Sequence, residues 1–241
     1  ISAFFRFVQS DIALRSSEID FFRMILQSGD LCDRIYSVKN DTAGKARGEG
    51  KMIHPIKHFI TITKHRHKVI AHTFRCGIGL QGLFHDLSKY SPTEFIPGAR
   101  YYTGKRSPNE GERAEYGYSA AWLHHKGRNR HHYEYWYDID PQKKIYVPVE
   151  MPVRYLKEMF CDRVAASKIY HKNDYDNSYP YNYFINSNAK NLMHERTAAT
   201  LEKWLIMLRD EGEKKTFAYI KHLPNREKRK SKADGDGSRK I

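Results

Sequence analysis

The side chains of this sequence best suited to holding a metal ion are a histidine and an aspartate that are neighbours in the chain. His85 and Asp86 lie within the segment GLFHDLSKYSP at 82–92, at the end of an apolar run. An imidazole and a carboxylate together suit Zn, Fe, Mn or Co better than Ca. Adjacent side chains on a helix diverge by about 100°, so an ion held by both needs further ligands from other helices.

Two further positions offer such ligands. His65 lies in a segment with helical periodicity, and Asp162 lies inside an apolar helical stretch between Phe160 and Val164. An aspartate in such a stretch costs several kcal/mol unless it is paired or coordinated. Asp162 is therefore expected either to coordinate an ion or to pair with its neighbour Arg163.

A second group of histidines lies at the end of the helix predicted at 109–126 and just beyond it. The segment LHHKGRNRHHYEYW at 123–136 holds four histidines among basic residues: His124, His125, His131 and His132, with Lys126, Arg128, Asn129 and Arg130 between them. A metal site flanked by cations is suited to a phosphate group. The alternative is that these histidines are surface or stacking residues beside the aromatic residues at 133–136.

Taken together, these segments resemble the HD-domain superfamily of metal-dependent phosphohydrolases. The likeness is closer to an uncharacterised family of bacterial and phage proteins. It is carried by KHRHKV, GLFHDLSKYSPTEF, YYTGKRSPNE, AWLHHKGRNRHHYEYW and EMFCDRVAASK, which span roughly residues 54–211.

The resemblance implies that His65, His85, Asp86 and Asp162 hold one ion. The spacing of 20 residues from His65 to His85 is shorter than in many members of the superfamily, and this leaves His67 and His72 as rival first ligands. The doublets His124–His125 and His131–His132 are loosely similar to the extra histidines that hold a second ion in some members. The cofactor is then one or two divalent ions, Mn, Fe, Co, Ni or Zn, with Mg also compatible.

The reaction implied is hydrolysis of a phosphate ester, with a small phosphorylated substrate such as a nucleotide. The resemblance gives catalytic roles to Asp86, Lys89 and His125. Lys89 lies four residues after His85, on roughly the same helix face. Contacts with the substrate are expected from Lys89, Lys126, Arg128 and Asn129. The alternative for Lys89 is an exposed cation near a helix C-terminus.

Two other functions remain open at this stage. The net charge is +14, and residues 222–241 hold seven Lys/Arg and three Asp/Glu, a net of +4, which leaves +10 on the rest of the chain. A basic body with many aromatic residues also suits a nucleic-acid-binding module whose metal is structural or absent. The extra histidines further permit a di-iron oxygenase of the HD fold.

The elements that must position these residues are expected to be helices. The patterns predict helices at 54–76, 80–90, 109–126, 152–170, 190–211 and 213–221, and Ser91, Pro92 and Glu94 form a helix start with a capping box. Residues 137–150 predict a β-hairpin or an extended loop, and residues 172–188 predict a loop. The fold class is all-α, an HD-type helical bundle with a short hairpin insertion.

Three regions are expected along the chain. Residues 1–50 are read as a helical extension with a linker, 51–221 as the metal-binding domain, and 222–241 as a basic disordered tail. The chain has three cysteines and no CxxC pair, which favours a reducing cytoplasm. No apolar run reaches about 18 residues and no signal peptide is recognised, so no membrane partner is expected.

Overall fold

The computed structural model describes residues 53–225, and these form two compact units. Within the described residues, the first unit comprises 53–68, 85–129 and 169–172. The second unit comprises 69–84, 130–168 and 173–225. The extension expected at 1–50 and most of the basic tail lie outside the described residues, so the three predicted regions stay predictions.

The helix predicted at 54–76 is confirmed as α4, Pro55–Arg75. Its residues up to Lys68 belong to the first unit and the rest to the second. Phe59, Ile62 and Val69 are buried along one side, as helical periodicity requires. The helix stops before Gly77, whose φ of 75° lies in the left-handed region that favours glycine.

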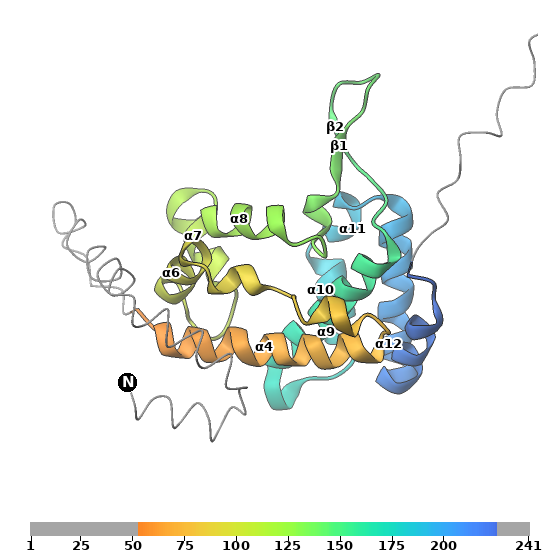
Figure 1. Ribbon diagram of the computed structural model, residues 1–241, viewed down its shortest axis with the longest axis horizontal. Coiled ribbons are helices and arrows are strands. Elements are labelled where there is room, and N and C mark those ends of the chain that lie inside the picture. The colour runs from red at the N-terminus through yellow and green to blue at the C-terminus, as the bar shows by residue number, and fades with distance from the viewer. Residues whose placement is uncertain (1–52, 226–241) are drawn as a thin grey trace, which may run out of the picture. The chain divides into compact units, whose positions relative to one another are not determined.

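The first unit adds three α-helices and a 3-10 helix to the N-terminal part of α4. These are η1 Leu87–Tyr90, α6 Pro92–Arg100, α7 Pro108–Tyr116 and α8 Ala120–Arg128. Helix α6 packs against both α7 and α8, as Figure 1 shows. Its Gly98 allows close approach, because a Cβ atom there would lie 2.2 Å from Nε2 of His58 on α4. Phe95 of α6 stacks on the same imidazole, with ring centroids 5.3 Å apart.

Two of the predicted helices are each interrupted. The helix expected at 109–126 is in fact α7 and α8, separated by Gly117 at a φ of 79°. The helix expected at 80–90 is in fact α5, Gly79–Gly82, and η1, with a turn at 83–86 between them. This second correction matters for function, because the turn carries His85 and Asp86.

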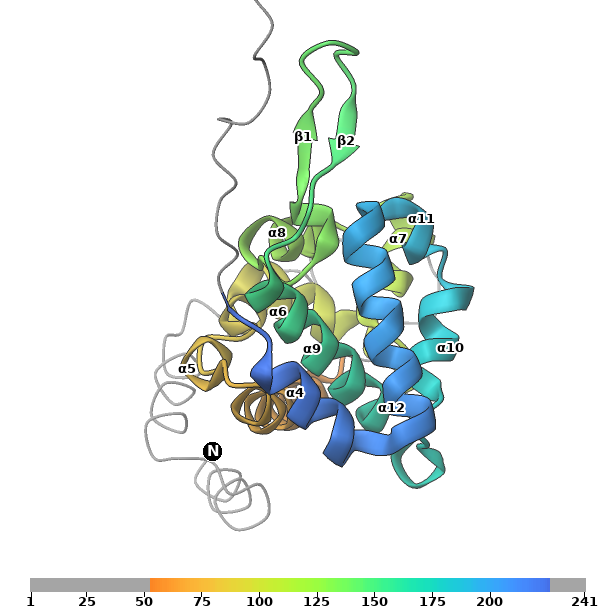
Figure 2. The same cartoon turned by 90° about the vertical axis from the view of Figure 1, so that its right-hand side faces the viewer.

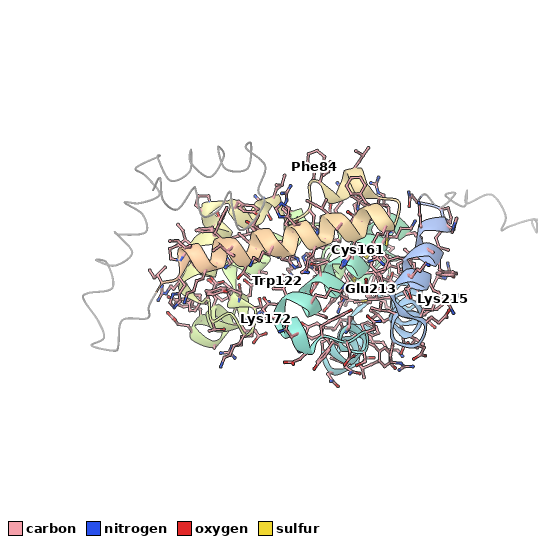
Figure 3. The ribbon with its side chains drawn as sticks, turned by 90° about the horizontal axis from the view of Figure 1, so that it is seen from below. Phe84, Trp122, Cys161, Lys172, Glu213 and Lys215 are labelled. Carbon is pink, nitrogen blue, oxygen red and sulfur yellow. The ribbon has the colours of Figure 1, made fainter. Side chains whose placement is uncertain are left out.

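The second unit is built on two long helices, α9 Val153–His171 and α12 Glu195–His222. Figure 2 shows α10, Tyr179–Asn186, and α11, Ala189–Leu192, along α12. Its core includes Phe160 of α9, which meets Trp204 of α12 edge to face at 6.1 Å. Figure 3 labels Cys161, a buried member of that core, and Phe84, whose ring is exposed.

The predicted hairpin is confirmed within this unit. Strands β1, Tyr137–Ile139, and β2, Tyr146–Pro148, pair antiparallel, with Asp138 opposite Val147, and project beyond the helices of the unit (Figure 2). The loop predicted at 172–188 is wrong, since it contains η3, Lys172–Asp174, and α10. The sequence predicts two helices that meet at 212. A break there is confirmed, because Gly212 has a φ of 80° and interrupts the helical backbone of α12.

The described residues are thus helical apart from one two-stranded sheet and connecting turns, which confirms the all-α fold class with a small hairpin insertion. None of the helices within residues 53–225 is both long and apolar enough to cross a membrane.

Candidate metal centre

Asp86 lies in an unusual backbone conformation at the start of η1. Its φ of 53° and ψ of 26° place it in the left-handed region, which aspartate tolerates better than most residues with a Cβ atom. Its side chain is only 2% exposed. A non-glycine residue held in this region is a common sign of a functional position. The conformation also removes the divergence expected for neighbours on a helix, because neither His85 nor Asp86 is helical.

Two imidazole rings face the carboxylate of Asp86. The Nε2 atom of His85 lies 3.1 Å from Oδ2 of Asp86, and the Nε2 atom of His65 lies 3.9 Å from the same oxygen. His65 comes from α4, one turn before the helix enters the second unit, and His85 comes from the turn at 83–86. Both histidines are buried, and their rings lie 5.7 Å apart.

The side chain of a lysine faces the same oxygen. Nζ of Lys89 lies 2.6 Å from Oδ2 of Asp86, because η1 brings residues three apart onto one side. The sequence predicted that Lys89 would lie on the same helix face as His85, and the structure places it against Asp86. The ammonium is about one-third exposed.

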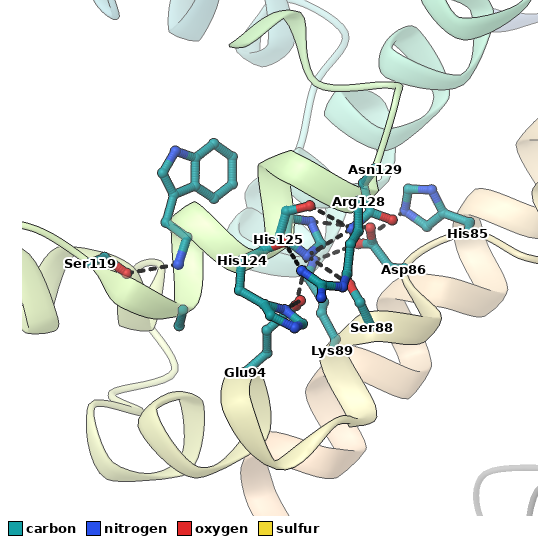
Figure 4. A network of polar contacts seen from close by, with 12 residues as sticks. His85, Asp86, Ser88, Lys89, Glu94, Ser119, His124, His125, Arg128 and Asn129 are labelled. Carbon is teal, nitrogen blue, oxygen red and sulfur yellow. Dashed lines mark hydrogen bonds and ion pairs between the residues drawn. The ribbon is translucent and has the colours of Figure 1, made fainter. Parts of the chain in front are cut away.

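A fourth contact to Asp86 comes from α8. Nε2 of His125 lies 3.2 Å from Oδ1 of Asp86, and Nδ1 of the same ring lies 2.7 Å from Oε2 of Glu94. The other oxygen of Glu94 lies 2.6 Å from Nδ1 of His124 (Figure 4). One buried carboxylate therefore orients the histidines of the first doublet through their Nδ1 atoms.

The role of Glu94 corrects a sequence prediction. The start of α6 at Pro92 is confirmed, with Ser91 at the N-cap position, but no side-chain capping bond forms there. The carboxylate of Glu94 turns to His124 and His125 instead of to the backbone of Ser91. The sequence analysis missed these contacts of Glu94, because the histidine doublet 30 residues away gave no local signal for them.

Other polar residues fix the position of His125. The amide of Asn129 donates to Oγ of Ser88 at 2.9 Å and to the carbonyl oxygen of His125 at 2.8 Å. Asn129, predicted to contact the substrate, thus holds η1 against α8. Arg128 is exposed at the end of α8, with Nη1 3.5 Å from the carbonyl of His124, and Lys126 is half-buried.

The charges of these groups stabilise one another. Burial alone would raise the pKa of Asp86, but the charges of His85, Lys89 and His125 outweigh it and hold that pKa well below its usual range. Burial alone would lower the pKa of His125, but Asp86 and Glu94 outweigh it and raise that pKa. Burial alone would also raise the pKa of Glu94, but its hydrogen bonds with His125 and His124 outweigh burial and lower that pKa. The surroundings of Asp86 and Glu94 therefore favour the ionised form of both carboxyl groups.

The donor set of this unit fits a transition metal ion. Ligands bonded to one ion at about 2.1 Å lie about 3–4 Å apart, which matches the distances from Oδ2 of Asp86 to the two imidazole nitrogens. One ligand atom from each of His65, His85 and Asp86 lies within 4.8 Å of the other two. Two imidazoles and a carboxylate suit Zn, Mn, Fe, Co or Ni. Of the two rival first ligands, His72 lies in the second unit against Phe217 and the carbonyl of Cys161, and His67 is half-buried on α4.

The remaining predicted ligands belong to the second unit. His131 is buried with Nδ1 3.3 Å from Oε1 of Glu158 on α9, and the ring of His132 lies 4.1 Å from that of His131. Glu158 was not predicted and also accepts a hydrogen bond from Gln81. Asp162 is half-buried one turn further along α9. The roles of Asp162, His131 and His132 as metal ligands stay predictions.

The fold and the site define the class of this protein: it is all-α and has a buried cluster of histidine and aspartate. The family model that matches the chain is described as a family of unknown function (DUF5662), and it covers residues 54–207. The chain belongs to this family, and the match includes every candidate site residue named above. No curated protein and no solved structure matches the chain.

Proposed function

We propose that this protein is a metal-dependent phosphohydrolase. The observation that carries the proposal is the convergence of His65 and His85 on one carboxylate oxygen of Asp86, in a buried cluster of the first unit. The resemblance to HD-domain phosphohydrolases supports it, because that resemblance rests on the same residues. Asp162, which the resemblance adds as a fourth ligand, is part of the proposal.

His65, His85 and Asp86 would hold the ion. A divalent ion in such a site lowers the pKa of a bound water towards neutrality and so supplies a nucleophile for phosphorus. His125 lies next to this site, and its contacts with Asp86 and Glu94 raise its pKa and so favour the protonated ring. It can hold a proton at Nε2 for delivery to the oxygen of the leaving group. Glu94 acts through His125, as a positioning residue.

The cations of the first unit would receive the phosphate. Lys89 is partly exposed beside Asp86, and Lys126 and Arg128 follow His125 in the last turn of α8. Cations close to developing negative charge on phosphoryl oxygens lower the reaction barrier. Asn129 supports this arrangement through Ser88 and His125. A phosphate ester of a nucleotide fits these cations and the basic charge of the chain.

The chemistry of the thiols supports a cytoplasmic setting for this activity. Cys76 and Cys161 are buried, unbridged cysteines with sulfur atoms 3.5 Å apart. A close pair of thiols is retained in a reducing compartment and tends to be oxidised outside it. This is consistent with the odd cysteine count of the sequence.

The experiment compares Asp86→Asn with wild type and with Asp174→Asn, a change at an exposed aspartate in η3. Asparagine tolerates positive φ, so Asp86→Asn should fold. We expect it to lose most of the bound metal and at least about 10³-fold in turnover of phosphate esters, while Asp174→Asn keeps both. Metal per chain is measured after loading with each ion in turn, and turnover on a chromogenic diester and a nucleotide panel.

The proposal fails if Asp86→Asn keeps wild-type turnover, or if the loaded wild type hydrolyses no phosphate ester. The second outcome, with stoichiometric paired iron, would favour the di-iron oxygenase. No metal bound, with steeply salt-dependent affinity for nucleic acid, would favour the binding module. Loss of metal from Asp162→Asn, compared with the same control, tests the fourth ligand.

A further inference from the structure

Two arginines of the second unit converge on a single phenol oxygen. Nη1 of Arg130 lies 3.1 Å from Oη of Tyr155, and Nη2 of Arg154 lies 2.5 Å from the same atom. Arg130 follows α8, whereas Arg154 and Tyr155 are in the first turn of α9. Both guanidinium groups therefore donate to one neutral oxygen and must lie close together.

No carboxylate within residues 53–225 lies at ion-pair distance from either guanidinium group. Other arginines of the second unit have acidic partners, such as Glu213 for Arg75 and Glu150 for Arg196. Two like charges side by side repel each other, and an anion placed between them would remove that repulsion. Paired guanidinium groups also match the oxygens of a phosphate in geometry.

Aromatic rings surround the two arginines. The guanidinium of Arg130 lies 5.7 Å from the ring centre of Tyr135, and that of Arg154 lies 4.4 Å from the ring centre of Tyr155. Trp136 donates from its indole nitrogen to the carbonyl of Arg130 at 2.7 Å and so fixes that residue's backbone. Tyr135 is exposed, which leaves a flat ring available for stacking next to the cations.

Open space lies beside Arg154. It lines a pocket of about 270 Å³ together with the turn from Gly77 to Gln81 and with Asn225. The pocket belongs wholly to the second unit. The pocket leaves room for a ligand beside the guanidinium group of Arg154.

We propose that Arg130, Arg154 and Tyr155 form a phosphate-binding site on the second unit, and that its ligand carries a planar base beside the phosphate. The chemistry shared by the candidate ligands is a phosphate next to a nucleobase, either in a mononucleotide or in a single strand. The phosphate bridges the two guanidinium groups, and the base stacks on the exposed ring of Tyr135. The site contains none of the proposed metal ligands, so it does not depend on the phosphohydrolase activity.

The test is calorimetric titration of the metal-free full chain with inorganic phosphate, adenosine monophosphate and a short oligothymidylate. We expect at least one nucleotide probe to bind. The double change Arg130→Gln and Arg154→Gln should weaken that binding at least about tenfold, and Tyr155→Phe should weaken it several-fold because the arginines lose their shared acceptor. Equal binding of the mononucleotide and the oligomer per phosphate indicates a mononucleotide site, and binding of the oligomer alone indicates a single-strand site.

Arg113→Gln is the matched control. Arg113 also lies over an aromatic ring, Trp122 at 5.6 Å, but it belongs to the first unit. It should leave the affinity unchanged. The proposal is overturned if no probe binds, if the double variant binds as wild type does, or if Arg113→Gln weakens binding as much as the double change. The double variant should keep wild-type turnover of phosphate esters when loaded with metal, so failure of the metal site and failure of this site can be told apart.

Discussion

Nζ of Lys89 lies 2.6 Å from Oδ2 of Asp86, and His85 and His65 face this same oxygen. Three nitrogens thus lie within 4 Å of one carboxylate oxygen. A lysine in this position neutralises the carboxylate when no other cation does so. It also competes with a divalent ion for that oxygen, because the two cations repel each other at such short range. The affinity of the site for metal is therefore expected to depend on Lys89.

Lys89→Met should strengthen metal binding and weaken catalysis. Loss of the competing ammonium is expected to raise metal affinity about 3–10-fold, and loss of a charge near the phosphoryl group to lower turnover about 10²–10³-fold. Competition with a fluorescent chelator gives the affinity, and turnover is measured with metal in excess. Lys105→Met, at an exposed lysine, is the control. Weaker metal binding in Lys89→Met would contradict competition, and unchanged turnover would remove Lys89 from the reaction.

Glu94→Gln should destabilise the first unit. The carboxylate accepts from His124 and His125, and an amide group in its place presents a donor to one of two imidazole nitrogens. We expect a loss of about 2–3 kcal/mol in the free energy of unfolding, measured by denaturant titration. Glu110→Gln is the matched control, since Glu110 also follows a Ser-Pro helix start but is exposed, with Arg106 at 3.7 Å. That change should cost less than about 0.5 kcal/mol. Equal losses in the two variants would show that Glu94 does not hold the histidines.

These two glutamates also show how far the sequence could predict the site. Ser91-Pro92-Thr93-Glu94 and Ser107-Pro108-Asn109-Glu110 have the same pattern, and both begin a helix. Local sequence determines such starts, because proline and serine act through their own backbone. Where each glutamate side chain turns depends on what packs against it, and only Glu94 faces the histidines of α8. Long-range contacts of this kind leave no trace in local spacing.

The turn at Asp86 could not be predicted from local sequence for a similar reason. Apolar residues on both sides of 82–90 continue a helical pattern, so the sequence predicts one helix there. The structure instead holds Asp86 at positive φ, with its carboxylate in contact with His85 and Lys89 nearby in the chain and with His125 from α8. By contrast, α4 and α9 have long periodic faces, and the sequence predicts both within a few residues. The helix predicted at 190–211 begins only at Glu195, because α11 and a break precede it.

Acid should destabilise the first unit through His58. Burial, with a smaller contribution from the charge of Lys89, lowers the pKa of His58 to about 3 in the folded state, against 6.5 for the free side chain. Below pH 6.5 the unfolded chain binds a proton that the folded chain does not, so stability falls as the pH drops towards 3. The slope is about 1.4 kcal/mol per pH unit at most. Stability above pH 7 is not affected by this group.

His58→Leu should remove that part of the slope. Unfolding is measured by denaturant titration at several pH values between about 6 and 4, where the difference from wild type is largest. His222→Gln, a change at an exposed histidine, should keep the wild-type slope. If His58→Leu and wild type lose stability in parallel, His58 takes up its proton without cost and is not held neutral by the fold.

Lys157→Met should destabilise the second unit, although it removes a buried charge. The side chain of Lys157 is 0% exposed, and Nζ donates to the carbonyl oxygens of Leu223 and Cys76, at 2.8 and 3.4 Å, and to Oδ1 of Asn225 at 2.8 Å. Its three donors thus satisfy three acceptors, two of them where the chain leaves α12. Methionine fills a similar volume but leaves the carbonyl oxygens of Cys76 and Leu223 without this donor, at about 1–3 kcal/mol each, whereas Asn225 is exposed to water. This loss outweighs the relief from desolvation of the ammonium. We expect a net loss of about 2–4 kcal/mol in the free energy of unfolding.

Lys190→Met, which breaks an exposed pair with Glu202, should cost less than about 1 kcal/mol. A smaller loss for Lys157→Met than for Lys190→Met would show that the end of α12 is held by other contacts.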